Sequence, residues 1–255
     1  MATQLAAQLY TIRQFMKTPE EMAVSLKKIR DMGWQAVQLS GHGPIAPQKL
    51  RQLLDDAELK VCATHTGFER MRDQMEDVME EHRVLGCQNL AIGGLPAKYR
   101  ESGAAGYAHF AQEASQVAAK LAVNGFTWSY HNHSFELEKF DGRSALAILY
   151  EESDPKCFLG EIDTYWIQHG GGDPAQWILD LKGRIKLLHL KDMGVLNRQP
   201  VMAEIGEGNL NWPRILSAAA ESGVEWYIVE QDVCQRDPFE SLAISLRNLK
   251  AMGLQ

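Results

Sequence analysis

The sequence predicts an α/β fold in which eight strand–helix units close into a single (β/α)8 TIM barrel, and three observations support this prediction. The chain has 255 residues, the length typical of one such barrel. Short apolar runs alternate with longer amphipathic runs eight times, which indicates parallel strands joined by helices. No GxGxxG motif follows the first apolar run, so an open nucleotide-binding sheet loses its best signal.

The first four units have clear strand and helix signals. The first strand is expected over Gln4–Tyr10. Its helix begins at Thr18, because Pro19 and Glu21 complete an N-terminal capping box, and it ends near Gly33. The next three strands are expected over Ala36–Ser40, Lys60–His65 and Asn89–Gly93, and the helices that follow them over Pro47–Glu58, Met71–Leu85 and Ala104–Val123.

The last four units keep the same alternation, with one longer connection over Met193–Leu210. Because no linker or low-complexity segment interrupts the pattern, we expect one domain over residues 1–255. The strands are expected over Phe126–His133, Cys157–Asp163, Ile185–Asp192 and Trp226–Asp232, and the helices over Arg143–Glu152, Pro174–Leu181, Trp212–Ser222 and Pro238–Met252.

Composition and charge narrow the classes of partner and compartment. The net charge of −7 argues against non-specific binding to nucleic acid. The four cysteines form no CxxC pair, so neither a disulfide framework nor a zinc knuckle is indicated. The start of the chain lacks the pattern of a signal peptide, and no run approaches the roughly 18 apolar residues of a membrane span. We therefore expect a cytoplasmic protein with no membrane partner.

Residues capable of acid–base and metal chemistry lie at the ends of the expected strands, which meet at one mouth in a barrel of this kind. They are His65, His131, His133, Glu161, Asp163, His189, Lys191, Asp192, Glu230 and Asp232, with Glu136 just beyond the fifth strand. Charged groups that converge in this way repel one another or lose hydration unless a cation neutralises them. The sequence therefore predicts a divalent metal ion at the barrel mouth.

Five segments resemble one known superfamily of barrels. YHNHSFE (130–136), DTYW (163–166), HLKD (189–192), EIGEGNLNW (204–212) and VEQD (229–232) resemble the xylose isomerase-like barrels. Within them they are similar to the sugar phosphate isomerase/epimerase group, which includes inosose dehydratases and ketose 3-epimerases. The resemblance covers nearly the whole chain and implies a small sugar or cyclitol substrate. It also implies a homodimer, since members of the family often pair.

The resemblance implies that four residues, one from each of the last four strands, hold the metal ion. The family usually has Glu, Asp, His and Glu there, and Asp163, His189 and Glu230 match the last three. The first position falls on His131, where the epimerases have a glutamate that moves protons together with the last one. This departure puts a two-glutamate shuttle in doubt, and Glu136 is the alternative residue to complete the metal site.

The remaining candidates have a functional and a structural interpretation each. Glu230, Glu136 and His65 are the candidates for the catalytic base, although His65 could simply be hydrogen-bonded at the barrel end. His133, Trp166, Lys191, Glu161 and Glu207 are the candidates for substrate contact. Trp166 stands where some relatives carry a histidine, and it offers a flat face to a sugar ring. His133 and Glu161 could instead support a metal ligand, Lys191 could pair with an acid, and Glu207 could form a turn.

A site of two imidazoles and two carboxylates suits Mn, Co, Zn or Fe(II) better than Mg. Such an ion acts as a Lewis acid, chelates a carbonyl and a neighbouring hydroxyl, and stabilises an enediolate. The first hypothesis is therefore an isomerase or epimerase of a small keto sugar, without phosphate because no phosphate-binding loop is evident. The second is a lyase, a dehydratase or β-eliminase, acting on a keto-cyclitol or keto-glycoside. The third is a non-catalytic barrel that binds sugar or metal.

Overall fold

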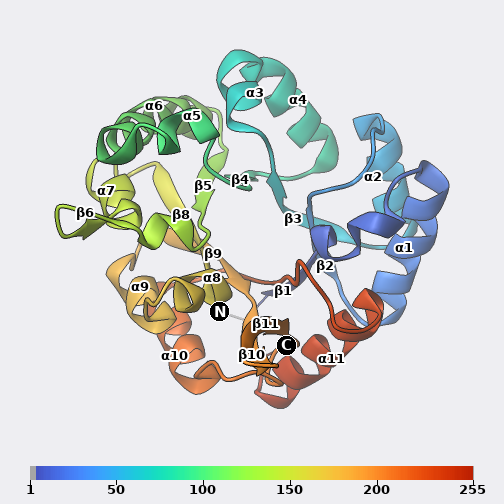
Figure 1. Ribbon diagram of the computed structural model, residues 1–255. Coiled ribbons are helices and arrows are strands. Elements are labelled where there is room, and N and C mark those ends of the chain that lie inside the picture. Colours follow the sequence, from blue (N-terminus) through green and yellow to red (C-terminus); the bar gives the residue numbers. More distant parts are fainter. Residues whose placement is uncertain (1–3, 255) are drawn as a thin grey trace.

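The computed structural model describes residues 4–254, in which eight parallel strands close into a barrel. The order around the barrel is β1, β12, β9, β8, β5, β4, β3 and β2, so the last strand pairs with the first (Figure 1). This confirms the predicted (β/α)8 barrel. The barrel strands are β1 (Gln4–Gln8), β2 (Ala36–Leu39), β3 (Lys60–His65), β4 (Asn89–Ile92), β5 (Thr127–His131), β8 (Phe158–Asp163), β9 (Ile185–Leu190) and β12 (Trp226–Val229).

Helices surround the strands as an outer ring (Figure 1). The capping box predicted at the first helix is present, because Thr18 Oγ1 accepts from the Glu21 backbone and Glu21 Oε2 accepts from the Thr18 backbone. Within residues 4–254 no helix is both long and apolar enough to cross a membrane. The main helices are α1 (Pro19–Asp31), α2 (Pro47–Asp56), α4 (Met75–Leu85), α6 (Gly103–Val123), α7 (Ala145–Glu151), α9 (Pro174–Asp180), α10 (Trp212–Ser222) and α11 (Pro238–Ala251).

Several short elements lie in the connections, where the sequence predicted none. The helix predicted over Met71–Leu85 is two helices, because the backbone of Gln74 (φ −131°, ψ 40°) is not helical. The connection predicted over Met193–Leu210 contains an antiparallel hairpin. The short elements are α3 (Phe68–Asp73), α5 (Ala97–Arg100), α8 (Thr164–His169), the 3-10 helices η1 (Leu9–Phe15) and η2 (Phe135–Leu137), and the strand pairs β6 (Lys139–Phe140) with β7 (Arg143–Ser144) and β10 (Asp192–Leu196) with β11 (Gln199–Ala203).

Six barrel strands end earlier than the sequence predicted, and four of them end two or three residues earlier. β1 ends at Gln8 instead of Tyr10, β5 at His131 instead of His133, β9 at Leu190 instead of Asp192, and β12 at Val229 instead of Asp232. Glu230 nevertheless stays attached to the barrel, because its backbone N–H donates to the Leu190 carbonyl. The polar residues that follow these strands therefore lie in loops directly above the barrel.

The interior of the barrel has an apolar layer below a polar one. The lower layer is a buried cluster of Ala6, Ala36, Cys62, Ala63, Leu187 and Ile228. Side chains two residues apart on a strand point to the same side, so the residue two positions further along lies one layer higher. On five strands the residue two positions after a member of the apolar layer is polar. These polar residues are Gln8, Gln38, His65, His189 and Glu230. The end of the barrel at which the strands finish, here called the upper end or mouth, is therefore lined by polar side chains.

Candidate metal centre at the barrel mouth

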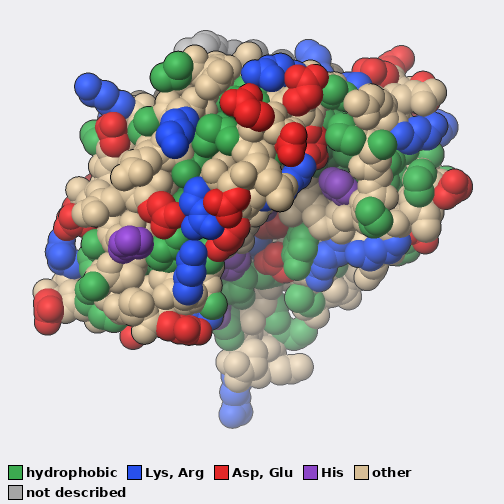
Figure 2. Space-filling model, turned by 90° about the horizontal axis from the view of Figure 1, so that it is seen from above, with side chains coloured by type: hydrophobic (Ala, Val, Ile, Leu, Met, Phe, Trp, Pro, Cys, Tyr) green, Lys and Arg blue, Asp and Glu red, His purple; other side chains and the backbone are tan. Residues whose placement is uncertain are grey.

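Four predicted metal ligands converge at the upper end of the barrel, and we call them the outer group. They are His131 at the end of β5, Asp163 at the end of β8, His189 on β9 and Glu230 after β12. Each offers one ligand atom, and the four atoms lie within 4.8 Å of one another. All four side chains are at most 4% exposed. Figure 2 shows a recess in the molecular surface in which histidine and acidic side chains are visible.

The spacing within the outer group is close to that of a metal site. His131 Nε2 lies 3.9 Å from Asp163 Oδ2, and His189 Nδ1 lies 3.8 Å from the same oxygen. His189 Nδ1 lies 3.1 Å from Glu230 Oε2. Tetrahedral ligands about 2.1 Å from a zinc ion are ~3.4 Å apart, so small side-chain shifts would suffice. Asp163 Oδ2 is buried, and the Lys191 ammonium lies 3.0 Å from it, so this oxygen is in a position that favours a positive charge.

Neighbouring amides orient the ligands. Asp163 Oδ1 accepts from the Trp166 backbone at 3.0 Å and so caps α8, which leaves Oδ2 to face the outer group. His189 Nε2 lies 2.6 Å from Gln38 Oε1. Because an amide oxygen only accepts, Nε2 must carry the hydrogen, and Nδ1 is directed toward the carboxylates. Gln8 Nε2 in turn donates to Gln38 Oε1 at 2.8 Å.

Lys191 is fully buried beside the outer group. Its Nζ lies 3.0 Å from Asp163 Oδ2, 2.7 Å from Glu230 Oε2 and 2.8 Å from Asp232 Oδ2. With His189 neutral, as a metal ligand must be, three carboxylates against one ammonium leave two negative charges, which a divalent cation would balance. Burial lowers the pKa of Lys191, but the three acids outweigh burial and raise that pKa far above its ordinary value. Lys191 therefore remains charged.

The titration of the ligands follows from burial and from their neighbours. Burial raises the pKa of Asp163 to about 6, with the Glu230 charge adding to it. Burial lowers the pKa of His189, but Glu161 and Glu230 outweigh it and raise that pKa to about 10. For His131, burial and the surrounding histidines hold the pKa well below the ordinary value. One imidazole thus carries a positive charge among the acids, and the other is neutral and ready to bind a cation.

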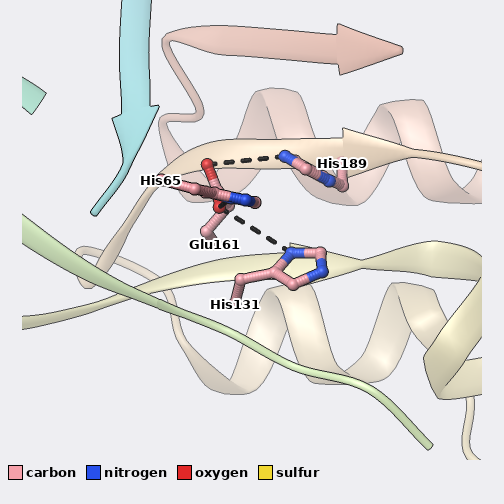
Figure 3. A group of neighbouring side chains, drawn as sticks. All are labelled: His65, His131, Glu161 and His189. Atoms are coloured by element: carbon pink, nitrogen blue, oxygen red, sulfur yellow. Dashed lines mark hydrogen bonds and ion pairs between the residues drawn. The ribbon is translucent and has the colours of Figure 1, made fainter. Parts of the chain in front are cut away.

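Glu161 lies one layer below Asp163 on β8 and joins three histidines from beneath. Its Oε2 lies 2.7 Å from His65 Nε2, and its Oε1 accepts from Gln38 Nε2 at 2.7 Å. Burial raises the pKa of Glu161, but His189 and His65 outweigh burial and lower the pKa to about 2. Glu161 is therefore an ionised carboxylate with no exposed surface. Its ligand atom and those of the three histidines lie within 4.8 Å of one another, and we call His65, His131, Glu161 and His189 the inner group (Figure 3).

His133 and Trp166 lie beside the outer group. The His133 ring lies 5.1 Å from the His131 ring and 5.4 Å from the Trp166 ring, measured between centroids. His133 Nδ1 and Trp166 Nε1 are buried nitrogen atoms that form no hydrogen bond within residues 4–254. Trp166 also lies under the Lys191 ammonium, 5.5 Å from its ring centroid. Both side chains therefore have an unused hydrogen-bonding nitrogen beside the outer group.

Glu136 and Glu207 lie apart from both groups. Glu136 Oε1 accepts from the Tyr130 hydroxyl at 2.7 Å, and its Oε2 accepts from the His133 backbone at 2.9 Å. Tyr130 alternates with His131 along β5, so Glu136 is held on the helix-facing side of the strand. It is therefore not a member of either group. Glu207 is exposed, and its carboxylate accepts from Asn248 on α11 at 2.9 Å.

Gln8 and Gln38 are site residues that the sequence analysis missed. Both are polar residues within short, otherwise apolar runs, two positions after Ala6 and Ala36. A polar residue at an inward-facing position of an apolar strand is the signal in the sequence that could have identified them. Asp232 was recognised only as a strand-end acid, and its role as a partner of Lys191 appears only in the folded chain.

We expect Glu136→Gln to remove a pH-dependent part of the stability. Burial raises the pKa of Glu136 from 4.5 to about 7. Its contribution to stability is fully present below pH 4.5 and is lost as the pH rises to about 7, because the unfolded chain ionises first. One pKa unit corresponds to about 1.4 kcal/mol. Between pH 4.5 and about 7, the free energy of unfolding of the wild type should therefore fall by about 3 kcal/mol relative to that of Glu136→Gln.

Urea unfolding at several pH values between about 4.5 and 7.5 measures this difference. The matched control is Glu138→Gln, an exposed carboxyl two residues away, whose profile should run parallel to that of the wild type. Parallel profiles for all three proteins would show that Glu136 ionises normally in the folded chain.

Comparisons with known proteins agree with this architecture. The family profile described as "Xylose isomerase-like TIM barrel" matches residues 26–252. A sugar phosphate isomerase/epimerase from Parabacteroides distasonis superimposes with a TM-score of 0.82 at 23% identity, covering 98% of this chain and 94% of that one. For an L-ribulose 3-epimerase the TM-score is 0.70 at 16% identity, over 100% and 95% of the two chains.

A protein described as the probable 3-DHS dehydratase of Bacillus anthracis has a TM-score of 0.71 at 13% identity, over 97% and 99% of the two chains. At such identities the likeness to solved structures shows a shared fold alone. No protein in the curated set matches this chain.

Proposed function

Because the chain belongs to the xylose isomerase-like TIM barrel family, we propose that it is a metal-dependent isomerase or epimerase of a small keto sugar, acting through an enediolate. The observation that carries this proposal is the outer group, in which four buried ligand atoms lie within 4.8 Å of one another at the barrel mouth. Its two imidazoles and two carboxylates suit Mn, Co, Zn or Fe(II). When bound, such a cation supplies Lewis acidity toward a carbonyl and an adjacent hydroxyl.

Glu230 is the candidate base that the geometry favours. His65 directs its Nε2 to Glu161, and Glu136 lies behind β5, so both are engaged elsewhere. Burial raises the pKa of Glu230, but Lys191 and His189 outweigh burial and hold that pKa well below its ordinary value. Glu230 is therefore ionised and able to take a proton from the carbon beside the carbonyl.

Lys191, His133 and Trp166 would hold and stabilise the substrate. The Lys191 ammonium lies 2.7 Å from Glu230 Oε2, so it would stand close to the oxygen on which negative charge develops. The Trp166 ring offers an apolar face to the sugar, and His133 would hydrogen-bond a hydroxyl. Together they would bind the sugar so that one carbon faces Glu230.

The proposal is tested by metal content and by isotope exchange. Protein purified without chelator or nickel should contain about one Mn, Co, Zn or Fe in the outer group, and Glu230→Gln should lose it. Deuterium from the solvent should enter a recovered keto sugar with the wild type and at least about a hundredfold more slowly with the variant. Glu225→Gln, at the opposite end of the same strand, is the matched control and should retain both properties.

A lyase acting on a keto-cyclitol or keto-glycoside is the second candidate. His131 stands where the epimerases have a glutamate, so the outer group has one carboxylate fewer to return a proton from the other face. Elimination needs one base and one acid. Glu230 would be the base and the Lys191 ammonium, 2.7 Å from its Oε2, would be the acid. Release of water or an aglycone, without deuterium in the recovered substrate, would favour the lyase. Tight sugar binding without either reaction would favour a binding protein.

A further inference from the structure

The rings of His131 and His189 each face two groups of ligands at once. His131 directs Nε2 toward Asp163 and Nδ1 toward Glu161, at 3.9 Å and 3.7 Å from the nearest oxygen. His189 directs Nδ1 toward Asp163 and Nε2 toward Glu161, at 3.8 Å and 3.6 Å. The outer group therefore uses only half of the nitrogen ligands that these rings offer, and the other half points into the inner group (Figure 3).

The inner group has the composition and size of a cation site. It offers three imidazole nitrogens and one carboxylate, a ligand set that zinc and cobalt accept readily. The distances of 3.6 Å and 3.7 Å are near the ~3.4 Å expected between tetrahedral ligands of such an ion, and only the 2.7 Å contact between His65 and Glu161 must widen. The side chains are at most 9% exposed.

One ligand atom of the inner group is left without a partner. His131 Nδ1 is buried and forms no hydrogen bond with any residue of the described chain, 4–254. Leaving a buried polar atom without a partner destabilises the fold, so a role for this nitrogen is to be expected. A cation between Glu161 and the two rings would use this nitrogen. It would also place a positive charge against a carboxylate that has no exposed surface.

We propose that the inner group binds a second divalent cation, so that His131 and His189 bridge two metal ions below the mouth. The bridging part of this proposal rests on the proposed outer metal site. The inner site itself needs only its own four ligands. It would make Glu161 and His65 metal ligands, instead of the substrate contact and the catalytic base that the sequence suggested.

The proton balance of this step is defined. With the outer cation bound, His131 Nδ1 and His189 Nε2 would each carry one proton, the latter donated to Gln38, and a further proton would lie between His65 and Glu161. A ring that bridges two cations carries no N–H, so His131 and His189 would each release one proton to the solvent when the second cation binds. His65 keeps its proton, which moves to Nδ1. Gln38 Oε1 retains Gln8 Nε2 as a donor, so it does not become an orphan.

The test is a count of cobalt ions on chelator-stripped protein. After equilibration with Co²⁺ and desalting, mass spectrometry should find about two ions per chain in the wild type, about one in Glu161→Gln and about one in Glu230→Gln. In a weakly buffered indicator solution, the second equivalent should release about two protons. His109→Gln, on the exposed surface of α6, is the control and should keep both ions.

His65→Gln serves if Glu161→Gln does not fold, and it should weaken the second site at least about tenfold while sparing the first. A single ion in the wild type that persists in both inner variants and is lost in Glu230→Gln would overturn the inner site and leave the proposed function intact. No bound ion in the wild type would contradict both proposals.

Discussion

Replacing Lys191 with methionine should lower the free energy of unfolding of the metal-free protein by about 3–5 kcal/mol. The ammonium is fully buried and lies within 3.0 Å of Asp163, Glu230 and Asp232. Methionine fills a similar volume, so the loss comes from leaving the carboxylates without their cation and not from a cavity. Urea unfolding in the presence of a chelator measures it.

The same variant should bind a divalent cation more tightly than the wild type does. The ammonium contacts Asp163 Oδ2 and Glu230 Oε2, which are ligand atoms of the outer group, so it competes with the metal for them. Saturating Mn²⁺ should therefore restore much of the lost stability. Lys186→Met, on the same strand but in an exposed pair with Glu225, should cost less than about 1 kcal/mol with or without metal. Equal losses for the two variants would contradict this account of Lys191.

Asp192→Ala should lower the free energy of unfolding by about 3 kcal/mol or more, because several donors lose one buried acceptor. Asp192 is fully buried, and its carboxylate accepts from four backbone N–H groups and one indole. The donors are Met193, Gly206, Gly208 and Leu210 through the backbone and Trp212 through Nε1. Asp192 thus holds the segment 204–212 against the barrel and ties it to the start of α10.

Limited proteolysis should show that cleavage within residues 204–210 becomes faster in Asp192→Ala, in parallel with the loss measured in urea. The matched control is Asp180→Ala, which removes an exposed carboxylate that is hydrogen-bonded to Gln176 and should change stability by less than about 0.5 kcal/mol. A stable variant with an intact segment would show that the five hydrogen bonds are replaced by water at little cost.

The barrel and the outer group could be predicted because both follow from short-range patterns. Alternating apolar and amphipathic runs determine the units, and the geometry of parallel barrels brings the residues after the strands to one mouth. Asp163, His189 and Glu230 needed only these rules and the family pattern. His131 was the position where the pattern departed, and its ligand atom lies within 4.8 Å of those of the other three predicted ligands.

The remaining features depend on contacts that no short pattern encodes. Glu136 follows β5 closely, but the turn at Phe135–Leu137 carries it back to Tyr130 on the helix-facing side. The hairpin of β10 and β11 falls within a connection whose sequence gave no clear alternation. Gln8 and Gln38 carry a signal in hindsight, yet an isolated glutamine in a strand does not reveal that it meets His189 from another strand.

The apolar layer beneath the polar one has a consequence for the traffic of ions. Ala6, Ala63, Leu187 and Ile228 have no exposed surface, so the barrel is sealed from below and an ion can pass only through the mouth. An ion in the inner group would therefore pass the outer group on its way in, and it could leave only after the outer ion has gone. A chelator should therefore strip a doubly loaded chain in two phases, and the rate of the slower phase should not depend on chelator concentration once the upper ion has gone. The depth at which an ion is bound in this barrel thus determines when it is released.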